Sequence, residues 1–202
     1  MENSQSESEE SSIHLEEILK CKEEFYESTK KNLFFKKAQK QDCAEVVSRK
    51  FDIVELMNHT FWIVPDQNIL YFDYRIFKLY GNPDNYQHII ENVIRFCVWC
   101  VAEYGDFVIS VNLASFTVSG AERYRDFILR FCEECMKDGV PYSDKLLAMN
   151  LYNIPNSVDQ ISKLLLPLIP VEVRPKLQLY RKDNSDDRLK QLYEDSGKIY
   201  TP

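Results

Sequence analysis

The sequence predicts an α/β fold in which a largely parallel or mixed sheet of about five strands is flanked by helices. Short runs rich in Val, Ile, Tyr and Phe alternate with longer segments whose apolar residues recur at helical spacing. This alternation begins near Phe51, and such an order requires right-handed crossovers between parallel strands. The 202 residues, 45% of them hydrophobic, are enough to bury one ordinary core. We therefore expect one α/β domain over residues 51–202.

The first half of this domain predicts two strands, a helix and a buried strand. FWIV (residues 61–64) and ILYFDYRIF (residues 69–77) are two β-rich runs around a turn sequence. YQHIIENVIRFCVWCVAEY (residues 86–104) has its apolar residues at helical spacing. FVISVNL (residues 107–113) is almost continuously apolar, which is typical of a strand covered on both faces.

The second half repeats this scheme. Residues 121–137 predict a helix, and KLLAMNLYN (residues 145–153) predicts the next strand. An amphipathic helix over residues 158–169 leads to a short strand, KLQLY (residues 176–180). DDRLKQLYED (residues 186–195) predicts a closing helix.

The N-terminal quarter has a different composition. Residues 1–12 are rich in Ser and Glu and lack aromatic and branched aliphatic residues, so we expect a disordered acidic tail. Residues 13–50 predict a helical segment whose second half mixes apolar and basic residues, as a helix on anionic lipid does. Its candidate membrane contacts are Leu33, Phe34, Phe35, Lys36 and Lys37. The alternative is that the three apolar residues pack on the domain core while the lysines stay in water.

Charge and hydropathy narrow the function classes. The net charge of −7 opposes general affinity for nucleic acid, so we expect no nucleic-acid partner. The chain has no run of eighteen or more apolar residues, and MENSQSESEE is acidic where a signal peptide is basic and then apolar. We expect a cytoplasmic protein, with peripheral membrane association as an alternative.

Two CxxC pairs, Cys97 with Cys100 and Cys132 with Cys135, raise the question of a zinc site. Structural zinc sites usually carry CxxC on a tight turn, whereas both pairs lie inside predicted helices without turn residues. Free cysteine is among the most buried residue types. We therefore expect these thiols to fill the core, and we expect no metal.

The sequence offers few signs of a catalytic site. It contains no GxGxxG, no GxxxxGK[ST], no GxSxG and no HExxH. His14, His59 and His88 are scattered, and none stands beside a Ser or Cys nucleophile in a recognisable arrangement. We expect a protein that is not an enzyme and that needs no cofactor.

The C-terminal third carries a resemblance to a known family. The stretch is DKLLAMNLYNIPNSVDQISKLLLPLIPVEVRPKLQLY. It contains, in this order, a predicted strand, Asn153-x-Pro155, an amphipathic helix, Leu166-Pro167 and a short strand that begins with a lysine. This order resembles the CRAL-TRIO lipid-binding domain, the fold of the secretory-pathway phosphatidylinositol transfer protein. VISVNLASFTVSG (residues 108–120) is similar to an upstream strand of that family. The similarity covers roughly residues 55–195.

The resemblance implies an apolar cavity and a headgroup site. In this family a mobile gate helix closes the cavity, and here that helix would span residues 158–169. Its cavity-facing residues would be Val158, Ile161, Leu164, Leu165 and Leu168. An acidic residue and a lysine hold the lipid headgroup in phosphoinositide-binding members, and they correspond to Asp144 and Lys176. The alternative is that Asp144 caps a turn and Lys176 is solvated.

Two functions follow as expectations. The first is a non-catalytic lipid-binding or lipid-transfer module for a phospholipid, a phosphoinositide or another hydrophobic ligand. The second is a protein–protein interaction scaffold like the BCH-type relatives, with a filled cavity and a partner such as a small GTPase. The 12 Phe and 12 Tyr residues favour the second, because large rings fill space. The chain departs from the family pattern at some positions: Asn112 stands where the family has Asp, and Ser115 where it has Gly. These departures count against lipid exchange more than against the fold.

Overall fold

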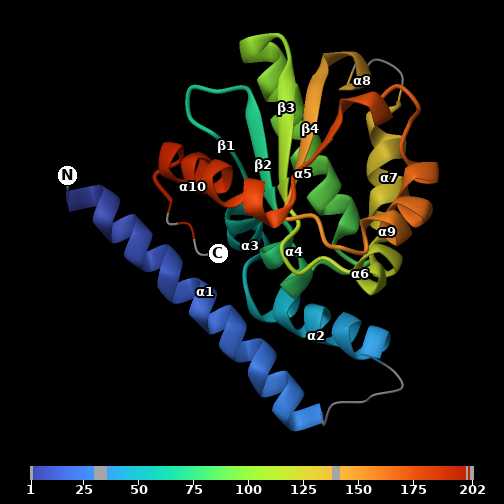
Figure 1. The fold of residues 1–202 in the computed structure, drawn as a ribbon. Helices are drawn as coiled ribbons and strands as arrows, with labels where there is room; N and C mark the ends of the chain where they lie inside the picture. Colours follow the sequence, from blue (N-terminus) through green and yellow to red (C-terminus); the bar gives the residue numbers. More distant parts are fainter. Residues whose placement is uncertain (1, 30–35, 138–141, 199, 201–202) are drawn as a thin grey trace.

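A computed structural model describes residues 2–29, 36–137, 142–198 and 200 of the chain. Over these residues the fold is α/β, with a five-stranded mixed sheet between helices (Figure 1), as the sequence predicts. The strands are β1 (Phe61–Ile63), β2 (Ile69–Asp73), β3 (Phe107–Asn112), β4 (Leu146–Tyr152) and β5 (Leu177–Leu179). They lie in the order β1-β2-β3-β4-β5; β1 runs antiparallel to β2, and the other neighbouring pairs are parallel.

Helices connect and cover these strands. The helices of the domain are α3 (Ile53–Thr60), α4 (Tyr74–Tyr80), α5 (Tyr86–Tyr104), α6 (Val118–Arg123), α7 (Arg125–Cys135), α8 (Tyr142–Lys145), α9 (Val158–Leu165) and α10 (Asp186–Asp195). Three 3-10 turns complete the chain: η1 (Leu166–Leu168), η2 (Arg174–Lys176) and η3 (Lys182–Asn184). α5 packs against β2 and β3. It ends at Gly105, whose φ of 87° is a left-handed conformation that glycine adopts easily.

Three predicted elements differ from the structure in their extent. Residues 69–77 do not form one strand, because the Asp73 carboxylate accepts a hydrogen bond from the Arg75 backbone N–H and begins α4. The helix predicted over residues 121–137 is divided at Tyr124 into α6 and α7. The helix predicted over residues 158–169 leaves α-helical geometry after Leu165 and continues as the Pro-containing turn η1.

The N-terminal segment forms two helices, α1 (Glu2–Thr29) and α2 (Lys36–Lys50). α1 begins at Glu2, so the structure has a helix over the segment in which the sequence predicts a disordered tail. Ile18 and Val47 are buried in the domain core. The candidate membrane contacts Leu33, Phe34 and Phe35 lie outside the described residues, and Lys36 and Lys37 begin α2.

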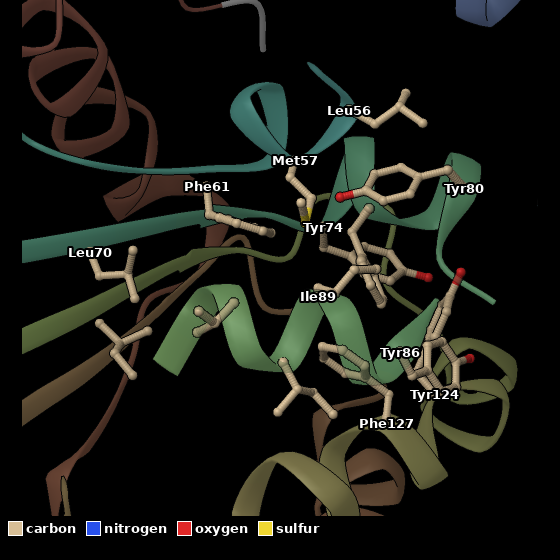
Figure 2. Packing of buried hydrophobic residues seen from close by; sticks show 14 of the residues in the cluster. Leu56, Met57, Phe61, Leu70, Tyr74, Tyr80, Tyr86, Ile89, Tyr124 and Phe127 are labelled. Atoms are coloured by element: carbon tan, nitrogen blue, oxygen red, sulfur yellow. The ribbon is translucent and has the colours of Figure 1, made fainter. Parts of the chain in front are cut away.

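Side chains of the sheet alternate between two hydrophobic clusters. On one face Leu70, Ile109 and Leu146 join the main core, part of which Figure 2 shows. On the other face Tyr71 and Tyr152 pack with residues of α10. The register of β3 and β4 shifts between the pairs Phe107–Leu146 and Val108–Ala148, so Leu147 is the extra residue of a bulge. The two faces therefore have separate neighbours, with α10 on one and α5, α7 and α9 on the other (Figure 1).

Candidate functional site

A cavity of about 490 Å³ lies between one face of the sheet and the helices that cover it. Ile109 and Met149 form part of its wall on the sheet, Phe131 on α7, and Ile161 and Leu165 on α9. These positions follow from the alternation of β3 and β4, which turns every second side chain toward the helices. The lining is almost wholly apolar, as a site for a hydrophobic ligand is.

The predicted gate segment contributes to this wall, although not with every expected residue. Val158, Ile161 and Leu165 line the cavity. Leu164 packs against the core, and Leu168 is half-buried outside the lining. At Leu168 the difference arises because the helix ends at Leu165, so the helical periodicity behind the prediction stops there; Leu164, inside the helix, turns to the core instead.

Residues that the sequence reasoning missed continue the wall beyond α9. They are Leu166, Ile169, Pro170, Val173 and Arg174. Prolines interrupt this segment, so it shows no regular periodicity. The available signal was composition: a short stretch in which apolar residues surround three prolines.

Aromatic rings form part of the cavity wall, but they do not fill the cavity. Tyr74 and Phe116 pack edge to face with ring centroids 4.8 Å apart, and Phe77 and Phe127 have the same separation. Figure 2 shows several of these rings where α4, α5 and α7 meet. The abundance of Phe and Tyr therefore accounts for one dense part of the core, and an apolar cavity remains next to it.

The candidate headgroup residues Asp144 and Lys176 lie near each other, but neither lines the cavity. The Lys176 ammonium group donates hydrogen bonds to the backbone carbonyl oxygens of Ser143 at 2.5 Å and Leu146 at 2.6 Å. Lys176 is half-buried, whereas Asp144 is exposed on α8. Lys176 therefore connects η2 to the start of β4, and two of its three donors are already used.

Among the described lining residues, Arg174 is the one cation. Its Nε donates to the Ile169 carbonyl oxygen at 3.0 Å, which fixes the turn between η1 and η2. The residue is exposed, so its guanidinium group lies where the lining meets solvent. Ser143 and Ser162 add hydroxyl groups to the lining. These few polar groups are the donors available to the polar end of an amphipathic ligand.

The cysteines of the two CxxC pairs lie on the helical side of the core. Cys97, Cys132 and Cys135 line the cavity, while Cys100 is buried outside its lining. Burial raises the pKa of Cys132 to about 11 and that of Cys135 to about 12, so both are neutral thiols at neutral pH. All four are free cysteines. Within the described ranges, no group of three or more His, Cys, Asp or Glu residues is placed to hold a metal ion.

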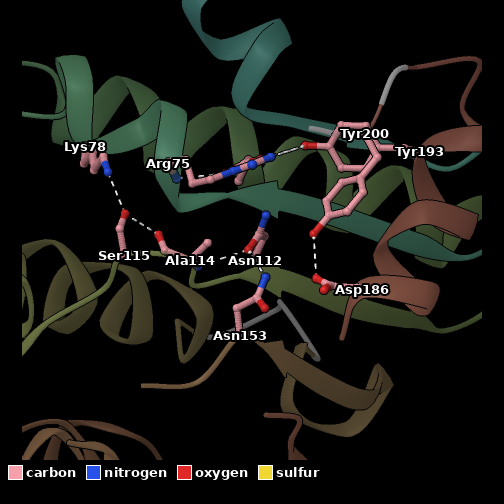
Figure 3. A network of polar contacts seen from close by, with 10 residues as sticks. Arg75, Lys78, Asn112, Ala114, Ser115, Asn153, Asp186, Tyr193 and Tyr200 are labelled. Carbon is pink, nitrogen blue, oxygen red and sulfur yellow. Dashed lines mark hydrogen bonds and ion pairs between the residues drawn. The ribbon is translucent and has the colours of Figure 1, made fainter. Parts of the chain in front are cut away.

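The opposite face of the sheet carries a polar network (Figure 3). The Asn112 side-chain oxygen accepts hydrogen bonds from the Ala114 backbone N–H and the Asn153 side chain, both at 3.0 Å. The network ties the carboxyl ends of β3 and β4 together. Asn112 and Asn153 are thus partners of each other at the ends of the two strands.

No family model matches the chain, and no curated protein matches it. None of the described helices is both long and apolar enough to cross a bilayer. The fold and the site define an α/β domain with an apolar cavity next to a short amphipathic helix.

Proposed function

We propose that this chain is a non-catalytic module that binds a lipid or another hydrophobic ligand in the cavity between the sheet and α7 and α9. The observation that carries the proposal is an apolar cavity of about 490 Å³, a volume in the range of about 300–1,000 Å³ that small-molecule sites have. The order of motifs that resembles the CRAL-TRIO domain supports the same function.

The energetics of the cavity support an occupant. Empty apolar volume in a core costs roughly 24 cal/mol per Å³. If closed and empty, a cavity of about 490 Å³ would cost on the order of 10 kcal/mol. The whole stability of a typical domain is about 5–15 kcal/mol. A hydrophobic ligand that fills the space restores the lost contacts, and its binding stabilises the folded protein.

A scaffold that binds a protein such as a small GTPase is the alternative. That function requires a cavity filled by aromatic rings, whereas the rings of Tyr74, Phe77, Phe116 and Phe127 pack against one another in the wall and leave about 490 Å³ open. We therefore place ligand binding first. A cytoplasmic location with peripheral membrane association belongs to this proposal, because a lipid-binding module must reach a bilayer to exchange its ligand.

The test compares ligand binding in the wild type with a variant whose cavity is filled. Protein purified from cells is extracted with organic solvent and the extract is examined by mass spectrometry; lipid-depleted protein is then titrated with a fluorescent long-chain fatty acid. We expect a co-purifying lipid and saturable fatty-acid binding. Met149→Trp, which adds a large ring to the sheet side of the cavity, should abolish both.

Leu147→Trp is the matched control. Leu147 lies on the same strand, does not line the cavity and is 54% exposed, so this variant should bind the fatty acid as the wild type does. Circular dichroism and thermal unfolding establish that both variants are folded. A lipid-free wild type that ignores the fatty acid, or equal binding by Met149→Trp, would contradict the proposal.

A further inference from the structure

A second pocket, of about 200 Å³, lies between the N-terminal helices and the domain. α1, α2, α4 and α6 contribute to its lining, together with the loop after β3. Three hydroxyl-bearing residues of that loop and of α6 face it: Ser115, Thr117 and Ser119. Unlike the apolar cavity, this pocket is surrounded by a mixture of polar and apolar groups.

Four cations line this pocket, each from a different helix: Lys22, Lys40, Lys78 and Arg123. Among the residues that the structure describes, no Asp or Glu is part of the lining, although the protein carries a net charge of −7. Among the described residues, none of the four forms an ion pair with a carboxylate. Positive charge is therefore concentrated here against the trend of the whole chain, as it is in anion sites.

Two of the other pocket cations, Lys22 and Lys40, act on Lys78. Burial lowers the pKa of Lys78, and the neighbouring charges of Lys22 and Lys40 lower it further. Asp73, the carboxylate that acts on Lys78 in the opposite direction, is already bonded to Arg75 and Tyr193. The pocket thus holds like charges at mutual cost, and an anion between them would relieve this repulsion.

Hydrogen bonds hold the Lys78 and Arg123 side chains in place at the pocket, and one Arg123 donor has no partner in the described part of the chain. The Lys78 ammonium group bonds the Ser115 hydroxyl at 2.6 Å (Figure 3). The Arg123 guanidinium lies 4.8 Å from the Tyr124 ring centroid and donates through Nη2 to the Gly81 carbonyl oxygen at 3.4 Å. Its Nε is buried and has no hydrogen-bond partner. A buried donor without a partner costs stability, so the Arg123 side chain beside the pocket keeps a hydrogen-bonding requirement that the described residues do not meet.

We propose that this pocket binds a phosphate-bearing ligand. Lys22, Lys40 and Lys78 act as point charges for its phosphate oxygens, and Arg123 adds directional donors. The ring of Tyr74 borders both the pocket and the apolar cavity, and it separates them. The inference is independent of the ligand in the cavity. The phosphate can belong to a soluble inositol phosphate or to a lipid headgroup, and the experiment distinguishes these sources.

The experiment measures thermal unfolding and binding with three probes: inorganic phosphate, inositol hexakisphosphate, and phosphatidylcholine vesicles with or without phosphatidylinositol bisphosphate. The full chain is compared with Lys22→Gln/Lys40→Gln, in which two charges are removed and no described hydrogen bond is lost. Lys20→Gln on α1 is the matched control, because Lys20 is exposed and does not line the pocket.

For the wild type and Lys20→Gln, we expect inositol hexakisphosphate or the phosphoinositide vesicles to bind and the soluble probe to raise Tm. The double variant should bind about tenfold more weakly for each cation removed, which corresponds to ~1.4 kcal/mol each. Without ligand, its Tm should equal or exceed that of the wild type, because repulsion is relieved. A purely structural role for these lysines would lower that Tm instead.

Binding of the soluble probe assigns a free phosphate compound, and binding of phosphoinositide vesicles alone assigns a lipid headgroup. Equal affinity of the wild type and the double variant, or binding of a phosphopeptide but neither of these probes, would overturn the proposal. Fatty-acid binding in the cavity is measured on the same samples. Fatty-acid binding should be unchanged in the double variant. The fatty-acid titration therefore tests the cavity, and the phosphate probes test the basic pocket, each independently of the other.

Discussion

The hydroxyl of Tyr193 donates a hydrogen bond to the buried carboxylate of Asp73, with 2.7 Å between Tyr193 Oη and Asp73 Oδ2. The bond joins α10 to the end of β2. The same carboxylate forms an ion pair with Arg75, whose Nη2 lies 3.0 Å from Asp73 Oδ2. Because the Asp73 side chain is almost fully buried, these partners replace the water that a carboxylate otherwise requires.

Tyr193→Phe should lower the free energy of unfolding by about 1.5–3 kcal/mol, the usual cost of losing a hydrogen bond to a charged group. Urea unfolding followed by circular dichroism measures the change. Tyr200→Phe is the control, because Tyr200 bonds the less buried Asp186 at 3.1 Å and should matter less. An equal decrease in the free energy of unfolding in both variants would show that the bond to Asp73 stabilises the protein no more than the bond to Asp186 does.

Lys176→Met should also destabilise the protein, by about 1.5–3 kcal/mol, since the carbonyl groups of Ser143 and Leu146 lose a charged donor while the aliphatic stem is kept. Lys145→Met, at an exposed position, should change stability little. The measurement is urea unfolding together with vesicle binding. If Lys176→Met has the free energy of unfolding of the wild type but a lower affinity for phosphoinositide vesicles, Lys176 binds a headgroup and does not stabilise the backbone.

Asn153 has a φ of 54°, in the left-handed region that Asn tolerates better than most residues. Asn153→Ala loses the bond to Asn112 and keeps the strain, whereas Asn153→Gly loses the bond and relieves the strain. We expect the Gly variant to be more stable than the Ala variant by about 1 kcal/mol. Differential scanning calorimetry of both variants checks this order. The reverse order would show that the positive φ at position 153 carries no strain that glycine relieves.

Periodicity predicted the elements that carry most of the fold. β3 is a continuous apolar run, and α5 has regular helical spacing followed by Gly105, so both were evident from the sequence. The end of β2 was not, because apolar residues continue past Asp73 and only the carboxylate's bond to the Arg75 N–H begins a helix there. At Ser115 the resemblance expects glycine, and its φ of 66° is a conformation that favours glycine.

The two pockets differ in how far the sequence reveals them. Val158, Ile161 and Leu165 lie on one face of a single amphipathic helix, so the cavity wall there was predictable. The basic pocket takes its cations from residues 22, 40, 78 and 123, which no spacing rule connects. The hydrogen bonds from Lys176 to backbone carbonyl groups could not be predicted either, because every residue has a carbonyl group and the sequence does not show which one accepts.

Stability should fall as the pH rises from about 9 to about 11, partly because of the thiols. Burial raises the pKa of Cys100 and Cys132 to about 11 and that of Cys135 to about 12, from an ordinary value of 9.0. In this window the unfolded chain has released thiol protons that the folded chain still holds. The unfolded state then binds fewer protons, so the free energy of unfolding decreases with pH.

Cys132→Ala/Cys135→Ala should flatten this decline relative to the wild type, as measured by urea unfolding at several pH values between 8 and 11. Buried tyrosines act in the same direction, for burial raises the pKa of Tyr74 to about 12, and they are common to both proteins. The difference between the two curves therefore isolates the two thiols. If the CxxC pairs held zinc, thiolate would be the bound form, and a chelator would destabilise the wild type at pH 7 but not the double variant.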